Sequence, residues 1–191
     1  IFWKKVEKSI FFLFFSIIIF MKTLFEIDLK DYDENGSRFE RPSVRGIIFK
    51  DDKIALVHSK KYDYYKFPGG GCKKGENQIE TLIREVQEET GLVVIPSSVK
   101  EYGMVHRIQK GDIDDIFVQD NYYYFCDVED IIQNQNLDDY EDEENFTLEF
   151  VKISEAIKVN KEHHHGEKDK DIFYQIMIER DSRVLEMLLE L

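Results

Sequence analysis

Apolar residues along this chain are grouped in short runs of the length and composition that strands favour. A turn at residues 33–36 predicts a first hairpin between residues 25 and 49. Polar residues 50–53 separate two further runs and predict a second hairpin. From residue 44 onward the strand-like runs are Val44–Phe49, Ile54–His58, Tyr64–Phe67, Val93–Ile95, Val99–Arg107, Ile116–Val128 and Phe146–Ile153.

The stretch between Asn77 and Gly91 has the signals of an amphipathic helix. Asn77 and Glu80 have the spacing of a capping box, and Gly91 suits the position just past the last turn. A short helix after residue 153 and a longer amphipathic one over about 170–191 are also expected. The apolar face of the first helix comprises Ile79, Leu82, Ile83 and Val86.

A second face of this helix carries Glu85, Glu88 and Glu89, which fall within an arc of about 100° on a regular helix. Clusters of like charge on helices are usually solvated surface, because neighbouring charges repel. This cluster follows directly on the glycine turn at residues 69–71, which can direct it toward a pocket. Converging carboxylates suit hard divalent cations such as Mg²⁺, so a metal site is the sharper hypothesis.

Composition limits the partners that such a site can serve. The 191 residues carry a net charge of −13, which argues against binding nucleic acid through its phosphates. A phosphate-bearing substrate would need metal cations or a local group of basic side chains. Cys72 and Cys126 form no disulfide framework and predict reduced thiols in a cytoplasmic protein.

Residues 1–20 differ from the rest of the chain. Three lysines precede an apolar run from Ile10 to Phe20, a stretch shorter than the ~20 residues that a membrane-spanning helix needs. We interpret this stretch as translated upstream sequence outside the fold, with Met21 as a natural start. A membrane anchor or uncleaved signal and a buried segment are the alternatives. Residues 21–191 are expected to form one domain, with its core over about residues 41–158. Binding to a membrane is not expected.

Two other motifs have some features of metal sites but lack the required ligands or geometry. The acidic stretch from Asp31 to Gly36 matches the first positions of an EF-hand calcium loop. The match fails further on, because Pro42 occupies the position where the loop requires a bidentate glutamate. The run His163–His165 has three consecutive side chains, which point in alternating directions on an extended chain. A solvated loop is the better interpretation of that run.

The stretch from Gly70 to Leu92 has a further regularity in its spacing. Its defined positions match the signature of Nudix hydrolases, so the chain resembles that family from about residue 41 to the C-terminus. Phe67–Gly70, leading into the signature, agrees with the resemblance. The matching residues are Gly70, Glu76, Arg84, Glu85, Val86, Glu88, Glu89, Gly91 and Leu92.

The resemblance implies a Nudix fold, an α/β/α sandwich with a mixed sheet between helices, and hydrolysis that depends on Mg²⁺ or Mn²⁺. By the same resemblance, the metal ligands are Glu85, Glu88 and Glu89, with Glu85 also a candidate general base. The Gly69 carbonyl and Glu144 are further candidate ligands, with Glu143 and Glu141 as alternates to Glu144. The implied structural supports of the motif are Gly70, Glu76, Arg84 and Gly91.

The implied substrate is a nucleoside diphosphate linked to another moiety, either a nucleoside triphosphate or a nucleotide-sugar type of compound. Position near the glycine turn suggests Arg45 and Lys66 as phosphate-binding residues and Tyr65 as a stacking partner for a base. Residues 103–107 contain no proline, which relatives that prefer ADP-ribose often carry in this region. A Nudix-fold module that senses a nucleotide without cleaving it is the alternative. The sequence leaves the oligomeric state open, with a homodimer as one option.

Overall fold

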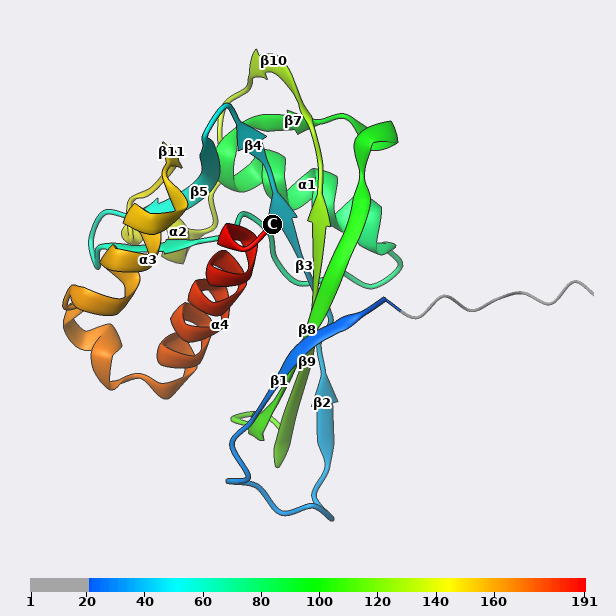
Figure 1. The fold of residues 1–191 in the computed structure, drawn as a ribbon. Coiled ribbons are helices and arrows are strands. Elements are labelled where there is room, and N and C mark those ends of the chain that lie inside the picture. The colour runs from blue at the N-terminus through cyan, green and yellow to red at the C-terminus, as the bar shows by residue number, and fades with distance from the viewer. Residues whose placement is uncertain (1–20) are drawn as a thin grey trace, which may run out of the picture.

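The computed structural model describes residues 21–191, so the predicted N-terminal extension, residues 1–20, lies outside the described residues. Within the described part, strands form a central layer with helices on both sides (Figure 1). No helix between residues 21 and 191 combines the length and apolar character needed to cross a bilayer.

The larger sheet is built around a long antiparallel pair, β8 (Lys100–Lys110) and β9 (Ile116–Phe125). Strand β1 (Thr23–Asp28) runs parallel to β8 on one side. Strands β2 (Arg38–Glu40) and β3 (Ser43–Ile47) both run parallel to β9 on the other side. Figure 1 shows β1 and β2 flanking the β8–β9 pair.

The hairpin predicted between residues 25 and 49 is wrong. Its two strands, β1 and β2, do not pair with each other but with opposite edges of the β8–β9 pair. Alternating apolar residues and a turn predict strands, yet they do not specify which partner a strand takes. The long antiparallel pair offers two edges with unpaired backbone groups, and each N-terminal strand satisfies one of them.

A second sheet contains β4 (Phe49–Lys50), β5 (Lys53–Ser59), β6 (Tyr64–Lys66) and β11 (Phe146–Val151). The predicted hairpin around residues 50–53 is confirmed, with Phe49 opposite Ile54. The chain changes sheets at Ile48, so the single run 44–49 supplies β3 to one sheet and β4 to the other. A small third sheet pairs β7 (Leu92–Val94) with β10 (Val128–Ile132).

Helix α1 (Gln78–Thr90) begins and ends as its sequence predicts. The Asn77 side chain accepts from two first-turn amides, Glu80 completes the capping box, and Gly91 ends the helix in the left-handed conformation at φ 74°. Its apolar face covers Val44 and Ile48 on one side of the strands.

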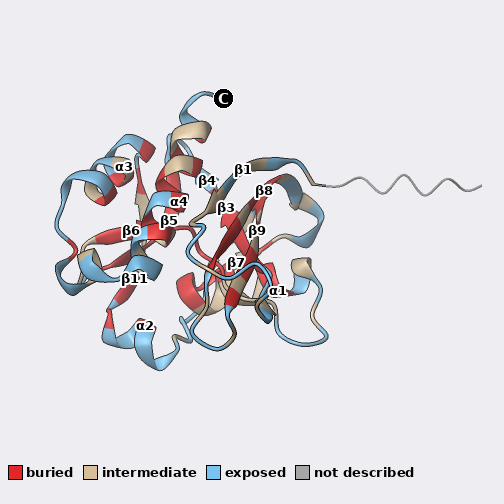
Figure 2. Ribbon diagram, turned by 90° about the horizontal axis from the view of Figure 1, so that it is seen from below, coloured by how far each residue is buried: buried red, intermediate tan, exposed pale blue. Residues whose placement is uncertain are grey.

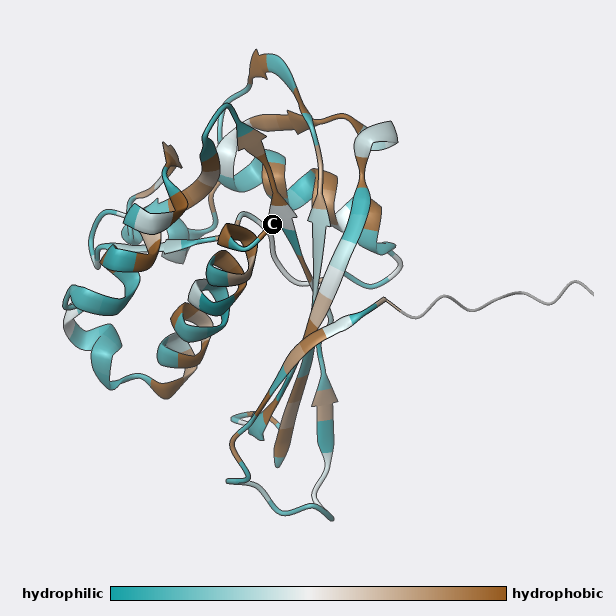
Figure 3. Cartoon of the chain, viewed as in Figure 1, coloured by the Kyte–Doolittle hydropathy of each residue, from teal (hydrophilic) through white to brown (hydrophobic). Residues whose placement is uncertain are grey.

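Helices α3 (Ile153–Glu162) and α4 (Ile172–Leu189) cover the opposite side of the strands. Ile47, next to Ile48 along the chain, packs there with Val184 and Leu185 of α4. Because successive strand residues point to opposite faces, the two helical layers enclose the sheet between them. This confirms the predicted sandwich, and α4 matches the expected C-terminal helix. Figure 2 shows the resulting buried central strands, and Figure 3 shows hydrophobic residues on them and on α1.

The remaining elements are short and connect these layers. They are the 3-10 helices η1 (Pro96–Ser98) and η2 (Gly166–Lys170) and the helix α2 (Asp139–Glu143). Helix α2 lies in the acidic loop between β10 and β11, where Glu141 caps it from inside its first turn.

Candidate active site

The glycine turn before α1 is fixed to strand β3 by backbone hydrogen bonds. The carbonyls of Pro68 and Gly70 accept from Gly46 and Val44 at 2.8 and 2.9 Å. Gly69, between them, has φ of 140°, and a Cβ there would lie 2.1 Å from the Val44 carbonyl oxygen. Only glycine fits this position, so the turn holds the Gly69 backbone in one place next to α1.

Glu85 packs directly against this turn. A Cβ added to Gly70 would lie 2.2 Å from a carboxylate oxygen of Glu85. The absence of a side chain at residue 70 therefore allows the glutamate to approach the backbone of the turn. This contact brings the first predicted ligand next to the Gly69–Gly70 segment, as the signature implies.

Arg84 connects three glutamates of the motif through one guanidinium group. Its Nε and Nη2 donate to the two oxygens of Glu76, each at 2.7 Å. Its Nη1 donates to Glu85 at 2.6 Å and to Glu88 at 2.9 Å. These bonds from Arg84 lower the pKa of the Glu76 carboxyl to about 2. The structure thus places Glu76 and Arg84 where they orient the loop and the two glutamates.

Glu89 faces the interior, unlike Glu85 and Glu88. One of its oxygens accepts from Lys66 Nζ at 2.7 Å and the other from the Gly69 amide at 2.9 Å. Burial raises the pKa of Glu89 to about 7, with Lys66 opposing the shift and the nearby charge of Glu141 adding to it. The third glutamate therefore joins the turn, the helix and β6.

The acidic loop holds the three carboxylates that were candidates for a further ligand, and their surroundings differ. Glu144 is buried among hydroxyl donors, accepting from Tyr64 at 2.7 Å and also from Ser59, Tyr174 and Lys168. The alternate Glu141 is the loop carboxylate whose charge acts on Glu89. Glu143 pairs with Lys61 at the surface. Ligation by Glu144 stays a prediction, and Glu141 is better placed than Glu144 to join the glutamates.

The three suggested substrate-binding residues separate into two groups. Arg45 and Lys66 are both buried. Lys66 donates a hydrogen bond to Glu89, and the charge of Arg45 interacts with the Glu89 carboxylate. Tyr65 points elsewhere, because its hydroxyl donates to Glu149 at 2.7 Å and its ring stacks on His58. The first two therefore border the glutamate helix, whereas base stacking by Tyr65 stays a prediction without support from its contacts.

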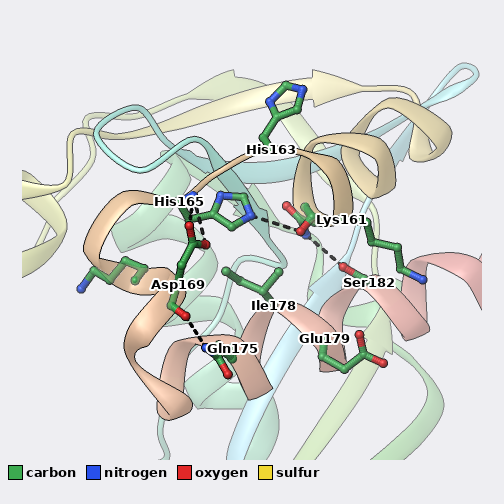
Figure 4. A pocket seen from close by; sticks show the side chains of 10 residues that line it. Lys161, His163, His165, Asp169, Gln175, Ile178, Glu179 and Ser182 are labelled. Carbon is green, nitrogen blue, oxygen red and sulfur yellow. Dashed lines mark hydrogen bonds between the residues drawn. The ribbon is translucent and has the colours of Figure 1, made fainter.

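The histidine run does not converge on one point. His163 contacts Asp63, His164 is exposed, and the ring nitrogens of buried His165 face the carbonyls of Tyr62 and Asn160 at 3.0 and 3.1 Å. His163 and His165 line a cavity of about 480 Å³ between α3, η2 and α4 (Figure 4). Their partners are carboxylate and backbone groups, which agrees with a structural role.

Two buried residues near the site were not anticipated from the sequence. Arg107 of β8 and Arg180 of α4 are each 1% exposed, and both lie close enough to Arg45 for their charges to interact. An arginine inside a strand-like or helical apolar run was the available signal. Sequence spacing could not reveal that these two residues meet.

The oxygen donors of the motif suit a hard divalent cation, but their present partners are cationic side chains. No group of three histidine, cysteine or acidic side chains in residues 21–191 is arranged for immediate metal ligation. Arg84 stands between Glu85 and Glu88, and Lys66 pairs with Glu89. Since these cations already balance the carboxylates, Mg²⁺ would have to displace part of their hydrogen bonding. The donor chemistry fits the ion.

The motif and the fold around it are shared with known proteins. The model of the NUDIX domain matches residues 40–174, which include the glycine turn, α1 and the acidic loop. This chain belongs to the Nudix family. A Nudix hydrolase from Nitrosomonas europaea has a similar fold, with 18% identity, a TM-score of 0.51, and coverage of 76% of this chain and 90% of that one.

Curated Nudix relatives match the part of the chain that surrounds the motif. The putative ADP-ribose pyrophosphatase YjhB of Bacillus subtilis is 34% identical over 64 residues, 34% of this chain and 31% of that protein. The ADP-ribose pyrophosphatase of Methanocaldococcus jannaschii is 36% identical over 75 residues, 37% of this chain and 44% of that protein. The 8-oxo-dGTP diphosphatase of Buchnera aphidicola is 41% identical over 56 residues, 27% of this chain and 43% of that protein. The matches span less than half the length of each relative.

Proposed function

We propose that this Nudix protein hydrolyses a nucleoside diphosphate linked to another moiety, with Mg²⁺ or Mn²⁺ as cofactor. The observation that carries the proposal is the arrangement of the glutamates around the glycine turn. Glu85 lies against Gly70, and Glu89 accepts from the Gly69 amide. The turn thereby brings oxygen donors of two glutamates to neighbouring residues, and such donors suit a divalent cation.

The roles of the chain's residues follow from their positions. Glu85, Glu88 and Glu89 would hold the cation, with the Gly69 carbonyl and a loop carboxylate, Glu144 or the better placed Glu141, as additional ligands. The cation would supply charge stabilisation on the diphosphate oxygens and activation of a water. Glu85 is the proposed general base, accepting a proton from the water that attacks phosphorus.

Other residues of the motif serve this arrangement without being ligands. Arg84, through its paired bonds to Glu76 at 2.7 Å, holds Glu85 and Glu88 in fixed orientations. Lys66 neutralises Glu89 in the interior, and Arg45 supplies positive charge beside it. The chain's net charge of −13 makes such local cations necessary for a polyphosphate substrate.

The substrate class includes two kinds of compound. Two relatives have names that refer to ADP-ribose and a third has one that refers to 8-oxo-dGTP. We therefore include both nucleoside triphosphates and nucleotide sugars, the substrates that the signature predicts. The absence of proline from residues 103–107 favours triphosphates as the first compounds to assay.

The test is to incubate the purified chain with a panel of nucleotides and Mg²⁺ or Mn²⁺. Release of phosphate and pyrophosphate measures hydrolysis. The variant Glu88→Gln/Glu89→Gln should lose activity while its circular dichroism spectrum stays unchanged. Glu129→Gln, an exposed change on β10, should keep full activity and serves as the matched control. Unchanged activity in the double variant would overturn the assignment. Nucleotide binding without turnover under either metal would instead favour the sensing module.

A further inference from the structure

Three arginines from three different elements are buried together between the larger sheet and α4. Arg45 of β3, Arg107 of β8 and Arg180 of α4 are 9%, 1% and 1% exposed. In the sheet, Arg45 lies opposite Tyr123, whose hydroxyl reaches Asp181 of α4 at 2.8 Å. This places the side chains on the helix-facing side of the sheet, and we refer to the three residues as the arginine cluster.

The hydrogen-bond donors of the arginine cluster are not all used. Arg45 Nε, Arg107 Nη2 and Arg180 Nη2 are buried and have no hydrogen-bond partner among residues 21–191. Buried donors without acceptors cost free energy, so structures normally provide each with a partner. Each of the three guanidinium groups therefore has one donor that an acceptor with several oxygens could satisfy.

The charge of the arginine cluster is also not balanced by carboxylates. In the described chain, the only carboxylate that bonds any of the three is Asp181, at 2.8 Å from Arg180 Nε. Arg45 donates to the Val44 carbonyl and Arg107 to the Gln109 amide oxygen, each at 2.7 Å. Asp181 alone among the described carboxylates thus bonds one of the three cations, whereas Glu89 and Asp171 act on Arg45 and Arg107 only through their charges. Buried charge without full compensation is unfavourable.

Burial and mutual repulsion act together on Arg107 and Arg45, whereas Asp181 and Tyr123 outweigh burial and raise the pKa of Arg180. Burial, with the charges of Arg180 and Arg45, lowers the pKa of Arg107 to about 9. Burial is also the main cause that lowers the pKa of Arg45. The Phe173 ring lies 4.2 Å from the Arg107 guanidinium carbon and stabilises its charge from one face. The ring face accepts no in-plane hydrogen bond, so Nη2 of Arg107 has no partner among the described residues.

A cavity lies near Arg107, although none of the three arginines lines it. This cavity of about 170 Å³ is lined by Gln109, Phe117 and Phe173, all neighbours of the Arg107 side chain, and by Arg41 and Lys110. Its acidic lining residues, Asp112 and Asp114, belong to the turn between β8 and β9. Phe173, which is 41% exposed, both lies over the Arg107 guanidinium and lines this cavity. At the other end, the charge of Arg45 acts on Glu89.

We propose that the arginine cluster is a binding site for a phosphoryl group, which would accept the three unpaired donors and balance the excess positive charge. Guanidinium groups match phosphate oxygens in geometry and charge. As a subsite for the substrate, this inference rests on the proposed function, because the charge of Arg45 interacts with Glu89, a proposed metal ligand. Binding of the anion itself requires neither metal nor hydrolysis.

The test is thermal unfolding of the metal-free chain in chloride and in inorganic phosphate at equal ionic strength, together with calorimetric titration of phosphate. The wild type should be stabilised by phosphate. Arg107→Met should unfold at a higher temperature than the wild type in chloride, because it removes one of three repelling charges. It should also weaken phosphate binding by roughly 10- to 100-fold, the loss expected for a hydrogen bond to a charged group.

Arg183→Met is the matched control, since Arg183 is on the same helix and lies over the Phe25 ring, away from the unpaired donors. It should keep the phosphate response. An equal response in Arg107→Met and wild type would overturn the proposal. So would a less stable or unfolded Arg107→Met in chloride, the result expected if the arginine served only the fold.

A further variant separates this inference from the proposed function. Glu88→Gln should lose hydrolysis and keep the phosphate response. Phosphate binding by the arginine cluster without any hydrolysis by the wild type would leave the site standing and overturn the proposed function. Hydrolysis by the wild type with a phosphate response that is unaffected by Arg107→Met would overturn the site alone.

Discussion

The ammonium group of Lys66 lies 2.7 Å from a carboxylate oxygen of Glu89, and both side chains are buried. The same carboxylate accepts from the Gly69 amide, so the pair joins β6, the glycine turn and α1. A buried ion pair adds little net stability by itself, but the loss of one partner leaves an isolated charge in the interior.

Replacement of Lys66 by Met is therefore expected to lower the free energy of unfolding by about 3–5 kcal/mol at mildly alkaline pH, where the Glu89 carboxylate is ionised. Urea denaturation measures the change. Lys61→Met is the control, because Lys61 pairs with Glu143 at the surface at 2.7 Å and should cost about 0–1 kcal/mol. The double variant Lys66→Met/Glu89→Gln should regain much of the loss; no recovery would show that the ion pair is not the cause.

Arg84→Lys keeps the charge at this position but removes the planar group that bonds Glu76 with two nitrogens and reaches Glu85 and Glu88 with a third. We expect the Mg²⁺ concentration for half-maximal hydrolysis to rise by roughly 10- to 100-fold, as for loss of other groups that orient ligands. Metal titration of the activity measures this. Arg183→Lys is the control on α4, and an unchanged metal requirement in Arg84→Lys would contradict the orienting role.

Gly70→Ala is expected to remove hydrolysis, because the new Cβ would lie 2.2 Å from the Glu85 carboxylate and displace it from the turn. Gly75 provides a matched comparison in the same loop. It has a φ of 93° but no heavy atom within 4 Å of an added Cβ, so Gly75→Ala should cost only about 1 kcal/mol of backbone strain. Steady-state rates and thermal unfolding of the two variants distinguish displacement of Glu85 from general strain. Equal activities of Gly70→Ala and Gly75→Ala would contradict a specific displacement of Glu85.

The interaction of Glu76 with Arg84 predicts a specific acid sensitivity. The folded-state pKa of Glu76, about 2, lies below its ordinary value of 4.5, so the pair stabilises the fold above pH 4.5. That contribution should be lost as the pH falls from about 4.5 toward 2. Thermal unfolding of the wild type and Glu76→Gln over this interval should show a difference that narrows with acidification. A constant difference would mean that protonation of Glu76 is not responsible.

Local signals were sufficient for the elements that surround the glutamates. The capping box of Asn77 and Glu80 and the left-handed Gly91 define α1 through contacts within a few residues, so a single sequence can reveal them. The resemblance to the signature likewise implied Glu76 and Arg84 as supports of the motif. These features depend on neighbours along the chain rather than on the tertiary fold.

Long-range features could not be predicted in the same way. The choice between Glu144 and Glu141 depends on how α2 is placed against Glu89, and the partners of β1 and β2 depend on the β8–β9 pair. Arg107 and Arg180 come together only because α4 packs over β8 and β9. Each of these contacts is decided by competition among surfaces that are distant in sequence.

The parallel pairing of β1 with β8 has a consequence for folding during synthesis. Residues 23–28 leave the ribosome early, yet the strand that completes their hydrogen bonds comprises residues 100–110. Their backbone groups therefore await a partner until most of the domain has been translated. At ~5–20 residues per second this interval lasts several seconds, during which the β1 segment is open to pairing with other chains. Slowed elongation before residue 110 should accordingly lower the soluble yield, and a chaperone that shields extended segments should restore it.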